Sequence, residues 1–342
     1  MNSRERVLAA IQCKPVDKAP FDFWAEPPTE NRLKQHFKTD DINALQASFN
    51  VDVFHPQPVT PAEKKIGSIY QNFWGERYIY KPTEWGLMRE DMPGALSKAE
   101  TREELEAFDW PSPNSFDYSG LEIACSAHRD QAILYGMADI WQRPSLVRGL
   151  ENALMDLALQ PDWVHYLARI FTDFYKEEYA NAFRASGNQI DIFLVISDLG
   201  GQENALISMA MFEEFVAPYL KEMTDRIHDL GAYAMFHSCG MVYPFISRLI
   251  ELGVDILDPI QPVTDNMKPE KLAADFKGKI CFHGGIDVQH VLPRGTTSEI
   301  EAEVQRYIRM LSPGYICCPS HLFQPDIPPE NIEAFYRAPR IP

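Results

Sequence analysis

The motif His237-Ser238-Cys239-Gly240 holds the residue types with the clearest chemical potential in this chain. It ends the apolar run 232–237, which is typical of a buried β-strand. Because they are two residues apart at the end of a strand, His237 and Cys239 can point to the same side. Imidazole nitrogen and thiolate sulfur are ligands that Zn²⁺ prefers. The motif therefore predicts two ligands of a zinc site.

A second group of residues with suitable ligand atoms lies near the end of the chain. Cys317, Cys318 and His321 stand at or just after the apolar run 315–319. Adjacent residues of a strand face opposite sides, so at most one of the two cysteines can easily serve a given site. Three protein ligands with an open fourth position characterise catalytic zinc sites, whereas structural sites have four. A third ligand from this group would complete a catalytic site.

Plain packing is the alternative interpretation for several of these residues. A single cysteine at a strand end commonly behaves as a small buried hydrophobic side chain. His55 and His283, which end other apolar runs, equally suit hydrogen-bonded core positions. The aromatic segment 66–90 is typical of a β-hairpin and favours a packed lid or an interface over a cofactor site.

Eight short β-rich runs must position these residues, and most of them are followed by a helical pattern. The runs are residues 19–24, 51–55, 132–137, 190–198, 232–237, 254–259, 279–285 and 315–319. Their nearly continuous apolar character indicates a parallel sheet covered on both faces. Eight such units predict an α/β fold, a (β/α)8 TIM barrel, in a single domain of residues 1–342 with the hairpin 66–90 inserted. An open doubly wound sheet is the alternative, but no GxGxxG motif follows an early strand.

Polar side chains gather at the carboxyl ends of these runs, where barrels of this kind carry their active sites. These candidates are Trp24, Glu26, His55, Asp139, Trp141, Ser197, Asp198, Gln202, His237, Cys239, Asp258, Gln261, His283, Asp287, Cys317, Cys318 and His321. A sheet with a purely structural purpose would not require such a concentration at one end.

Composition and charge exclude several classes of function. The chain has 342 residues, with 32 Lys plus Arg against 49 Asp plus Glu and a formal net charge of −17. Phosphate binding needs a basic patch, so we expect no nucleic-acid partner. No apolar stretch reaches the roughly 20 residues of a membrane span, and the N-terminus lacks the apolar centre of a signal peptide. We therefore expect a cytoplasmic protein, with no membrane partner, whose six cysteines are free thiols or metal ligands.

Several segments of the chain closely resemble the uroporphyrinogen decarboxylase superfamily. The most specific are FHSCG (236–240), DILDPIQP (255–262), FHGGIDVQHVLPRGT (282–296) and PSHLFQPDIPPENI (319–332). The chain looks most like the branch of cobalamin-linked methyltransferases, which RERVLAAIQCKPVDKAPFDFW (4–24) and SDLGGQ (197–202) also resemble. The resemblance runs nearly end to end and implies a (β/α)8 barrel.

This resemblance implies a zinc-dependent methyltransferase that moves a methyl group between a corrinoid protein and a small thiol or methylated substrate. Zinc would be held by His237, Cys239 and a late residue near the eighth strand. That late position falls on His321, with Cys318 or Cys317 as the alternatives. Methylcobalamin would be carried by the partner corrinoid protein.

Hypothetical roles follow for the remaining polar residues. Asp198 and His283 are predicted to act in catalysis, Asp198 by orienting or protonating the substrate. The predicted substrate-binding residues are Trp24, His55, Trp141, Gln202, Gln261 and Asp287. His283 and Asp287 could also fix the tautomer of a metal ligand.

Two other functions stay open. A porphyrinogen decarboxylase needs several cations for the carboxylates of its substrate, yet the matching stretch DFWAEPPTENR contains only Arg32. A non-catalytic paralogue would bind a corrinoid protein or a small molecule without turnover. The segment 66–90 could form part of a docking rim, and a homodimer is compatible with exposed aromatic side chains.

Overall fold

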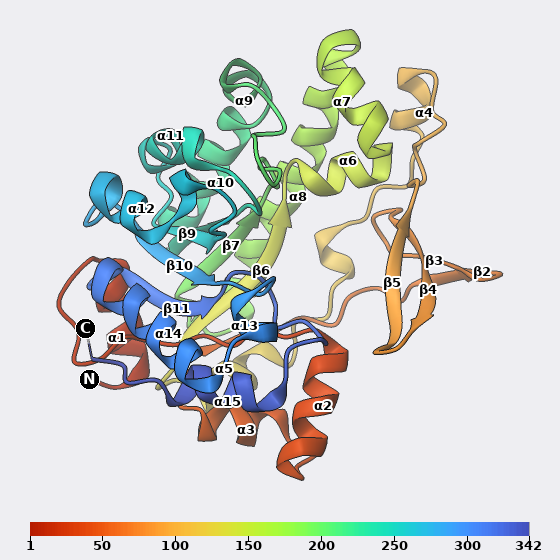
Figure 1. The fold of residues 1–342 in the computed structure, drawn as a ribbon. Helices are drawn as coiled ribbons and strands as arrows, with labels where there is room; N and C mark the ends of the chain where they lie inside the picture. Colours follow the sequence, from red (N-terminus) through yellow and green to blue (C-terminus); the bar gives the residue numbers. More distant parts are fainter. Residues whose placement is uncertain (342) are drawn as a thin grey trace.

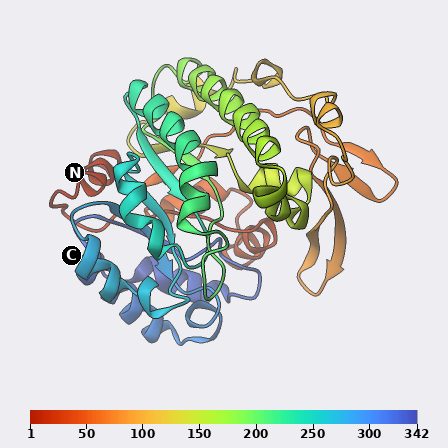
Figure 2. The ribbon, with the colours of Figure 1, turned by 90° about the horizontal axis from the view of Figure 1, so that it is seen from above.

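A curled sheet of seven parallel strands forms the centre of the computed structural model, which describes residues 1–341 (Figure 1 and Figure 2). In spatial order the strands are β1 (Val53–Phe54), β6 (Ala132–Asp139), β7 (Ile192–Ile196), β8 (Tyr233–His237), β9 (Ile256–Ile260), β10 (Cys281–Ile286) and β11 (Tyr315–Pro319). Each strand pairs in parallel with its neighbours. Seven of the eight predicted strands are thereby confirmed.

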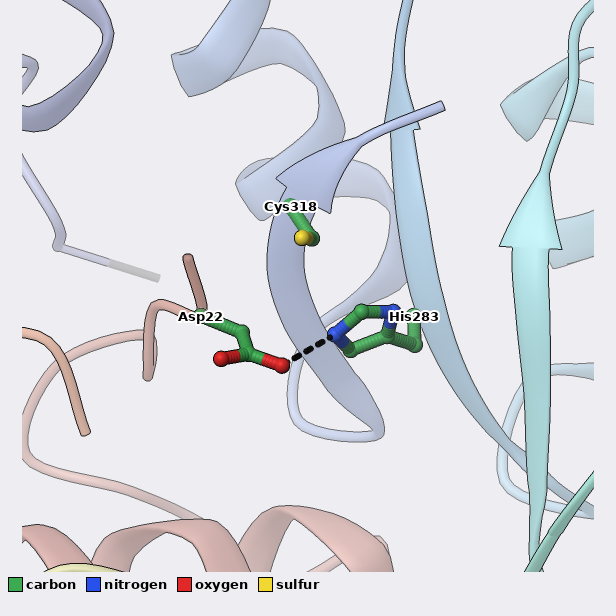
Figure 3. A group of neighbouring side chains, drawn as sticks. All are labelled: Asp22, His283 and Cys318. Carbon is green, nitrogen blue, oxygen red and sulfur yellow. Dashed lines mark hydrogen bonds and ion pairs between the residues drawn. The ribbon is translucent and has the colours of Figure 1, made fainter. Parts of the chain in front are cut away.

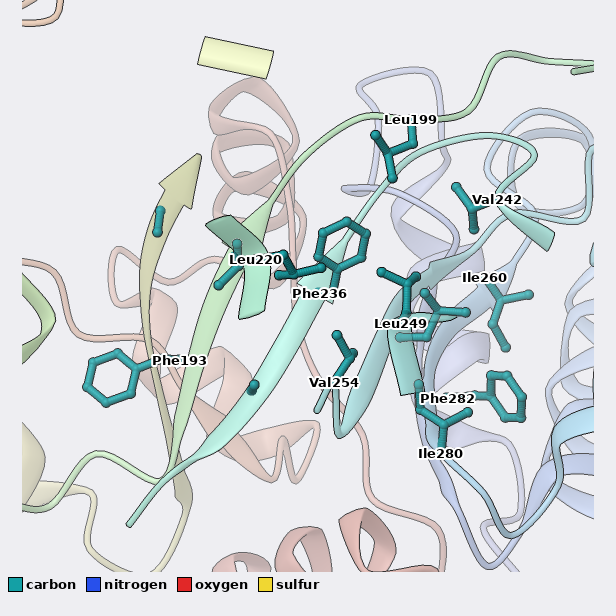
Figure 4. Close-up of a cluster of buried hydrophobic side chains, with 14 of the residues drawn as sticks. Phe193, Leu199, Leu220, Phe236, Val242, Leu249, Val254, Ile260, Ile280 and Phe282 are labelled. Atoms are coloured by element: carbon teal, nitrogen blue, oxygen red, sulfur yellow. The ribbon is translucent and has the colours of Figure 1, made fainter. Parts of the chain in front are cut away.

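Helices surround this sheet, as expected for parallel strands with apolar residues on both faces (Figure 2). They are α1 (Ser3–Ile11), α2 (Pro27–Phe37), α3 (Ile42–Ser48), α4 (Arg102–Glu106), α5 (Leu121–Ala127), α6 (Gln142–Arg148), α7 (Leu150–Leu159), α8 (Pro161–Ala185), α9 (Met209–Phe215), α10 (Ala217–Asp229), α11 (Ile246–Glu251), α12 (Pro269–Phe276), α13 (Val291–Arg294), α14 (Thr297–Leu311) and α15 (Pro329–Arg337). Figure 4 shows part of the core between the two layers, where Phe193, Phe236 and Phe282 of the strands lie among Leu220 of α10 and Leu249 of α11.

The inner face of the sheet changes from apolar to polar along the strands. Successive residues of a strand alternate between the two faces. On four strands, a core residue is followed two positions later by a polar residue on the same inner face. These pairs are Met235 and His237 (β8), Ile256 and Asp258 (β9), Cys281 and His283 (β10), and Ile316 and Cys318 (β11). At the amino end, Val7, Ala10 and Ile11 of α1 pack into the same apolar cluster. The polar groups are thus gathered at the carboxyl end.

The first predicted strand, residues 19–24, forms no regular strand. Its backbone still bonds to both edges of the sheet, because Asp22 N donates to a carbonyl of β11 (3.0 Å) and Asp52 N donates to Phe21 O (2.8 Å). Pro20 has no N–H, and the carboxylate of Asp52 accepts from the amide of Phe21 (2.9 Å). Because these donors are missing or taken by a side chain, the segment forms only isolated bridge pairs.

The insertion is larger than the predicted hairpin at 66–90. It is a four-stranded antiparallel sheet of β2 (Lys64–Ile66), β3 (Ile69–Gln71), β4 (Arg77–Thr83) and β5 (Gly86–Met92). This sheet extends from one side of the molecule (Figure 1). The predicted hairpin is its β4–β5 pair, with Trp85 at the tip.

The helical patterns of residues 144–158 and 211–230 each predict a single helix, and both are divided in the structure. The predicted helix 144–158 breaks at Gly149, whose φ of 88° is incompatible with a helix, and gives α6 and α7. The predicted helix 211–230 breaks at Val216, where Pro218 begins a new helix, α10. Within residues 1–341, no helix has the length and apolar character that crossing a membrane requires.

Candidate metal and substrate site

His237 and Cys239 lie together at the carboxyl end of β8, as the motif predicts. The Nε2 atom of His237 is 3.5 Å from Sγ of Cys239 and 3.9 Å from Oδ1 of Asp198, which follows β7. One ligand-type atom from each of the three side chains lies within 4.8 Å of the other two. All three residues are half-buried, so a small solute can reach them.

Two loops hold these residues beside each other. Gly240 has a φ of +77°, and a Cβ at this position would lie 2.4 Å from the carbonyl oxygen of Gly201. The backbone N–H of Met241 donates to the same oxygen (2.8 Å). Oδ1 of Asp198 accepts from the backbone N–H of Cys239 (2.9 Å). The close approach of the loops after β7 and β8 therefore sets the geometry of Asp198 and Cys239.

Asp258, on β9, bridges two histidines. Its Oδ2 accepts from Nδ1 of His237 (2.5 Å), and its Oδ1 accepts from Nδ1 of His283. Burial acts to lower the pKa of His237, but the charge and hydrogen bond of Asp258 outweigh it and raise that pKa well above its usual value. Burial also opposes the shift at Asp258, whose pKa the two histidines hold well below its usual range. Because Nδ1 is engaged, the Nε2 atom of His237 is the one beside Cys239.

Asp22, from the segment before α2, lies on the other side of His283 (Figure 3). Its Oδ2 is 3.1 Å from Nε2 of His283, and its Oδ1 is 2.7 Å from Nε2 of His55. Nε1 of Trp24 donates to the same carboxylate (2.6 Å). Burial acts to raise the pKa of Asp22, but the two histidines lower it below its usual range. Imidazoles and carboxylates thus alternate from His55 to His237.

Two clusters have the composition of a metal site, but only one has free ligand atoms. Cys318 lies near Asp22 and His283 (Figure 3). Both ring nitrogens of His283 already donate to carboxylates, however, and a doubly donating imidazole has no lone pair for a metal. Burial also raises the pKa of the Cys318 thiol far above its usual value. The cluster of His237 and Cys239 is therefore the candidate metal site.

A cavity of about 740 Å³ opens beside Cys239. Its polar lining consists mainly of amide side chains, those of Gln202, Gln261, Gln289 and Gln324. No Lys or Arg is among the described residues that line it, and Asp326 is the one carboxylate there. Such a wall suits a neutral or cationic small molecule and opposes a polyanion.

His321, the predicted third ligand, lines this cavity together with Cys239. It does not belong to the close group of ligand atoms, in which Asp198 has the third place. Nδ1 of His321 is 3.3 Å from Nε2 of Gln324. Burial, and after it the charge of His237, lowers the pKa of His321, so its ring is neutral at pH 7. A neutral imidazole keeps a lone pair and can still bind a metal.

The other predicted residues lie in three different places. Gln202 and Gln261 line the cavity beside Cys239 and a neighbouring one of about 360 Å³ that also includes Asp287. Trp24, His55 and His283 surround Asp22. Trp141 and Cys317 are buried in the core between the sheet and the helices, and burial raises the pKa of Cys317 to about 12.

Asp258 was expected among the polar residues at the carboxyl ends of the strands, but its bonds to His237 and His283 were not. Sequence reasoning did not identify several other residues that shape the site. Asp22 and Gln142 carry no signal in the sequence, although Gln142 donates to Oδ2 of Asp198 (2.7 Å). Trp85, at the tip of the β4–β5 hairpin, reaches the cavity from a segment that was predicted only as a lid or an interface.

Comparison with known proteins defines the class of this chain. Residues 137–340 match the uroporphyrinogen decarboxylase (URO-D) family, and the chain belongs to that family. A solved structure of a methyltransferase from Methanosarcina mazei is similar, with a TM-score of 0.72 and 17% sequence identity over 99% of this chain and 98% of that chain. At this identity the similarity shows a common fold. No curated protein matches the sequence.

Proposed function

We propose that this protein is a zinc-dependent methyltransferase, which moves a methyl group between a corrinoid protein and a small thiol or methylated substrate. The observation that carries the proposal is the pair of His237 Nε2 and Cys239 Sγ, 3.5 Å apart beside a large cavity. Membership of the URO-D family and the fold shared with the Methanosarcina mazei methyltransferase support it. Methylcobalamin would reach the cavity on the partner corrinoid protein.

The donor atoms suit a zinc ion. Zinc binds sulfur at about 2.3 Å and nitrogen at about 2.0 Å, so two ligands of a tetrahedral site lie roughly 3.5 Å apart. The distance of 3.5 Å from His237 Nε2 to Cys239 Sγ agrees with this spacing, whereas Asp198 Oδ1, at 3.9 Å from the same nitrogen, would have to move closer to bind the ion. We therefore assign His237, Cys239 and Asp198 as ligands, with His321 as the competing third ligand on the same cavity.

The chain's own residues prepare this site. Asp258 holds the Nδ1–H group of His237, so Nε2 is the ring nitrogen that would give up its proton to bind the metal. A bound zinc ion would act as a Lewis acid and favour the thiolate form of a substrate sulfur. Gln261 accepts from the backbone N–H of Gly240 through Oε1, which leaves its NH2 group free to donate to a substrate. His283 acts only through Asp258, as a positioning residue.

The cavity lining favours a neutral or cationic substrate such as a thiol, a methyl ether or a methylamine. A porphyrinogen carries many carboxylates, which need cations in the pocket. The described lining offers no Lys or Arg, and Asp326 would repel such a substrate. This is the specific reason to prefer methyl transfer over the decarboxylation that the family name suggests.

The β4–β5 hairpin is the proposed rim for the corrinoid partner. Trp85 and Met88 line the cavity from this hairpin, and Trp85 is partly exposed. The guanidinium of Arg32 lies 5.0 Å from the centre of the Trp85 ring, which ties the tip to the body of the protein. A partner that docks on this rim would bring its cofactor to the mouth of the cavity.

The proposal includes a closed (β/α)8 barrel formed by a single domain. In this architecture residues 19–25 take the eighth strand position between β11 and β1. The backbone bonds from Asp22 to β11 and from Asp52 to Phe21 support this arrangement. Closure would bring Asp22 and His55 to the same mouth as His283, in agreement with their hydrogen bonds.

Transfer of the methyl group from free methylcobalamin to a small thiol tests the proposed function. Zinc-loaded wild-type protein should react at least about a hundredfold faster than the Cys239→Ala variant, since the variant loses a metal ligand. Cys13→Ala, at the amino end of the sheet, should keep the wild-type rate. Equal rates in wild type and Cys239→Ala, or release of CO₂ from uroporphyrinogen, would contradict the proposal.

A further inference from the structure

A second cavity, of about 190 Å³, lies between β6, α8 and the segment that leads into the antiparallel sheet. It shares no lining residue with the cavity beside Cys239. Its aromatic lining residues are Phe73, Trp74, Phe116, Tyr135 and Tyr175. Its volume is far above the ~10–15 Å³ that one water molecule needs, so it can hold a small organic molecule.

Trp74 forms an enclosed wall with an unused hydrogen-bond donor. Its ring stacks on Phe171, with centroids 4.3 Å apart and planes at 21°, and meets the edge of Phe174 at 4.5 Å. Its Nε1–H group is buried, and no residue in the described part of the chain accepts a hydrogen bond from it. Buried donors are normally paired, so an acceptor atom of a ligand would satisfy this group.

Glu178, on α8, supplies a negative charge at the same cavity. Its side chain is 3% exposed and accepts a hydrogen bond from the hydroxyl of Tyr135 (2.5 Å). Within residues 1–341 no cationic side chain forms an ion pair with it. Burial raises the pKa of Glu178 to about 7, although the Tyr135 hydrogen bond opposes the shift. A buried carboxylate without a counter-ion is costly, and a bound cation would relieve that cost.

Arg143 also lines this cavity, but its charge is already matched. Its Nε donates to Oε1 of Glu76 (2.7 Å). Glu76 pairs in addition with Arg89 (3.2 Å), and Arg89 pairs with Asp91 (2.7 Å). The two arginines and two acids of this network balance each other. The charge that remains for a ligand is therefore that of Glu178.

We propose that this cavity binds a small organic ammonium compound that also carries a hydrogen-bond acceptor. The ammonium group would lie against Glu178 and the aromatic faces, because the faces of aromatic rings attract cations. The acceptor would bind Nε1–H of Trp74. The Glu178 carboxylate would repel an anionic ligand, and a neutral ligand would leave that carboxylate without a counter-ion. The inference depends neither on zinc nor on the proposed methyl transfer.

Calorimetric titration of the full-length protein with choline tests this site. Choline carries a quaternary ammonium and a hydroxyl, and 3,3-dimethylbutan-1-ol is its uncharged counterpart of the same shape. We expect choline to bind and the alcohol to bind at least about tenfold more weakly. Equal affinities, or no binding of choline at millimolar concentration, would overturn the proposal.

Matched variants show whether choline binds in this cavity or at the candidate metal site. Glu178→Gln keeps the size of the side chain and an acceptor for Tyr135, and it should weaken choline binding at least about tenfold. Glu177→Gln, on the exposed side of the same helix, should bind choline as wild type does. Cys239→Ala should also bind normally. Loss of binding in Cys239→Ala, or full binding in Glu178→Gln, would place choline elsewhere and refute the assignment.

Discussion

At the residue scale, the site depends on two buried carboxylates that are each held between two imidazole rings. The alternating members are His55, Asp22, His283, Asp258 and His237. Asp22 and Asp258 are buried, and each carboxylate has an imidazole on both sides, which is the condition under which ionised groups are tolerated in an interior. His237 is the last member of this series, and its Nε2 atom lies next to Cys239. The series therefore fixes the orientation of a proposed metal ligand.

Replacing Asp258 by Asn should weaken zinc binding by about 10- to 100-fold, because the partner that orients His237 loses its charge. Competition with a chromophoric chelator measures this affinity. Asp255→Asn is the matched control, since Asp255 makes a similar contact to His228 (2.8 Å) on the surface. Its zinc affinity should equal that of wild type. Unchanged zinc affinity in Asp258→Asn would contradict the role of Asp258 in positioning His237.

Glu178 predicts a pH dependence of stability. Burial raises the pKa of Glu178 to about 7, whereas an unfolded glutamate titrates near 4.3. The folded state therefore binds more protons between these values, and the free energy of unfolding should fall as pH rises from about 4.3 through 7. Glu178→Gln should reduce this fall by an amount on the order of a few kcal/mol. Urea unfolding at pH 5 and pH 8 measures the change in the free energy of unfolding between these pH values. The same change in wild type and Glu178→Gln would contradict a raised pKa of Glu178.

At the element scale, the strands follow from the sequence because buried parallel strands are short apolar runs. The runs 190–198 and 254–259 contain β7 and β9, and the polar residue at the end of each was visible in advance. The run 19–24 is also short and largely apolar, but it forms no regular ladder of backbone hydrogen bonds with its neighbours. Pro20 cannot donate, and the amide of Phe21 bonds to a carboxylate instead.

Contacts between elements could not be predicted in the same way. The bond from Asp258 to His283 depends on the register of β9 and β10, which shifts between Phe282 and Gly284. A strand pattern gives the face of each residue but not its neighbour across the sheet. For the same reason Asp198 was expected in catalysis and not beside Cys239 as a ligand atom. That contact requires two loops to meet.

Gly240→Ala tests the loop contact that joins Asp198 to Cys239. Its added Cβ would lie 2.4 Å from Gly201 O at a φ of +77°. Gly231 has a similar φ of +80° but no atom within 4 Å of a Cβ, so Gly231→Ala is the control for backbone strain alone. We expect Gly240→Ala to lower the free energy of unfolding by at least about 2 kcal/mol more than Gly231→Ala. Equal losses in urea unfolding would show that the loops adjust without cost.

At the scale of the whole molecule, segments distant in sequence meet at one edge of the sheet. Asp52, which is 1% exposed, accepts from Nη1 of Arg6 in α1 (2.6 Å). It also accepts from Phe21 N (2.9 Å) and from Nη1 of Arg340 near the end of the chain (3.3 Å). One buried carboxylate thus connects β1, the irregular first segment and both ends of the described chain.

Asp52→Ala should destabilise the protein by about 3–5 kcal/mol, because it leaves the buried guanidinium of Arg6 without its buried partner. Thermal and urea unfolding measure the loss. Asp17→Ala removes the other carboxylate on Arg6, which is 44% exposed, and should cost at most about 1 kcal/mol. Similar losses for the two variants would show that Asp52 has no special part in joining these segments.

The most direct test of the central claim is X-ray absorption at the zinc edge on zinc-loaded protein. We predict one zinc per chain, with one sulfur at about 2.3 Å and nitrogen or oxygen ligands at about 2.0 Å. The sulfur contribution should disappear in Cys239→Ala. A protein that binds no zinc, or a sulfur signal that persists in this variant, would contradict the assignment of His237 and Cys239 as a catalytic metal site.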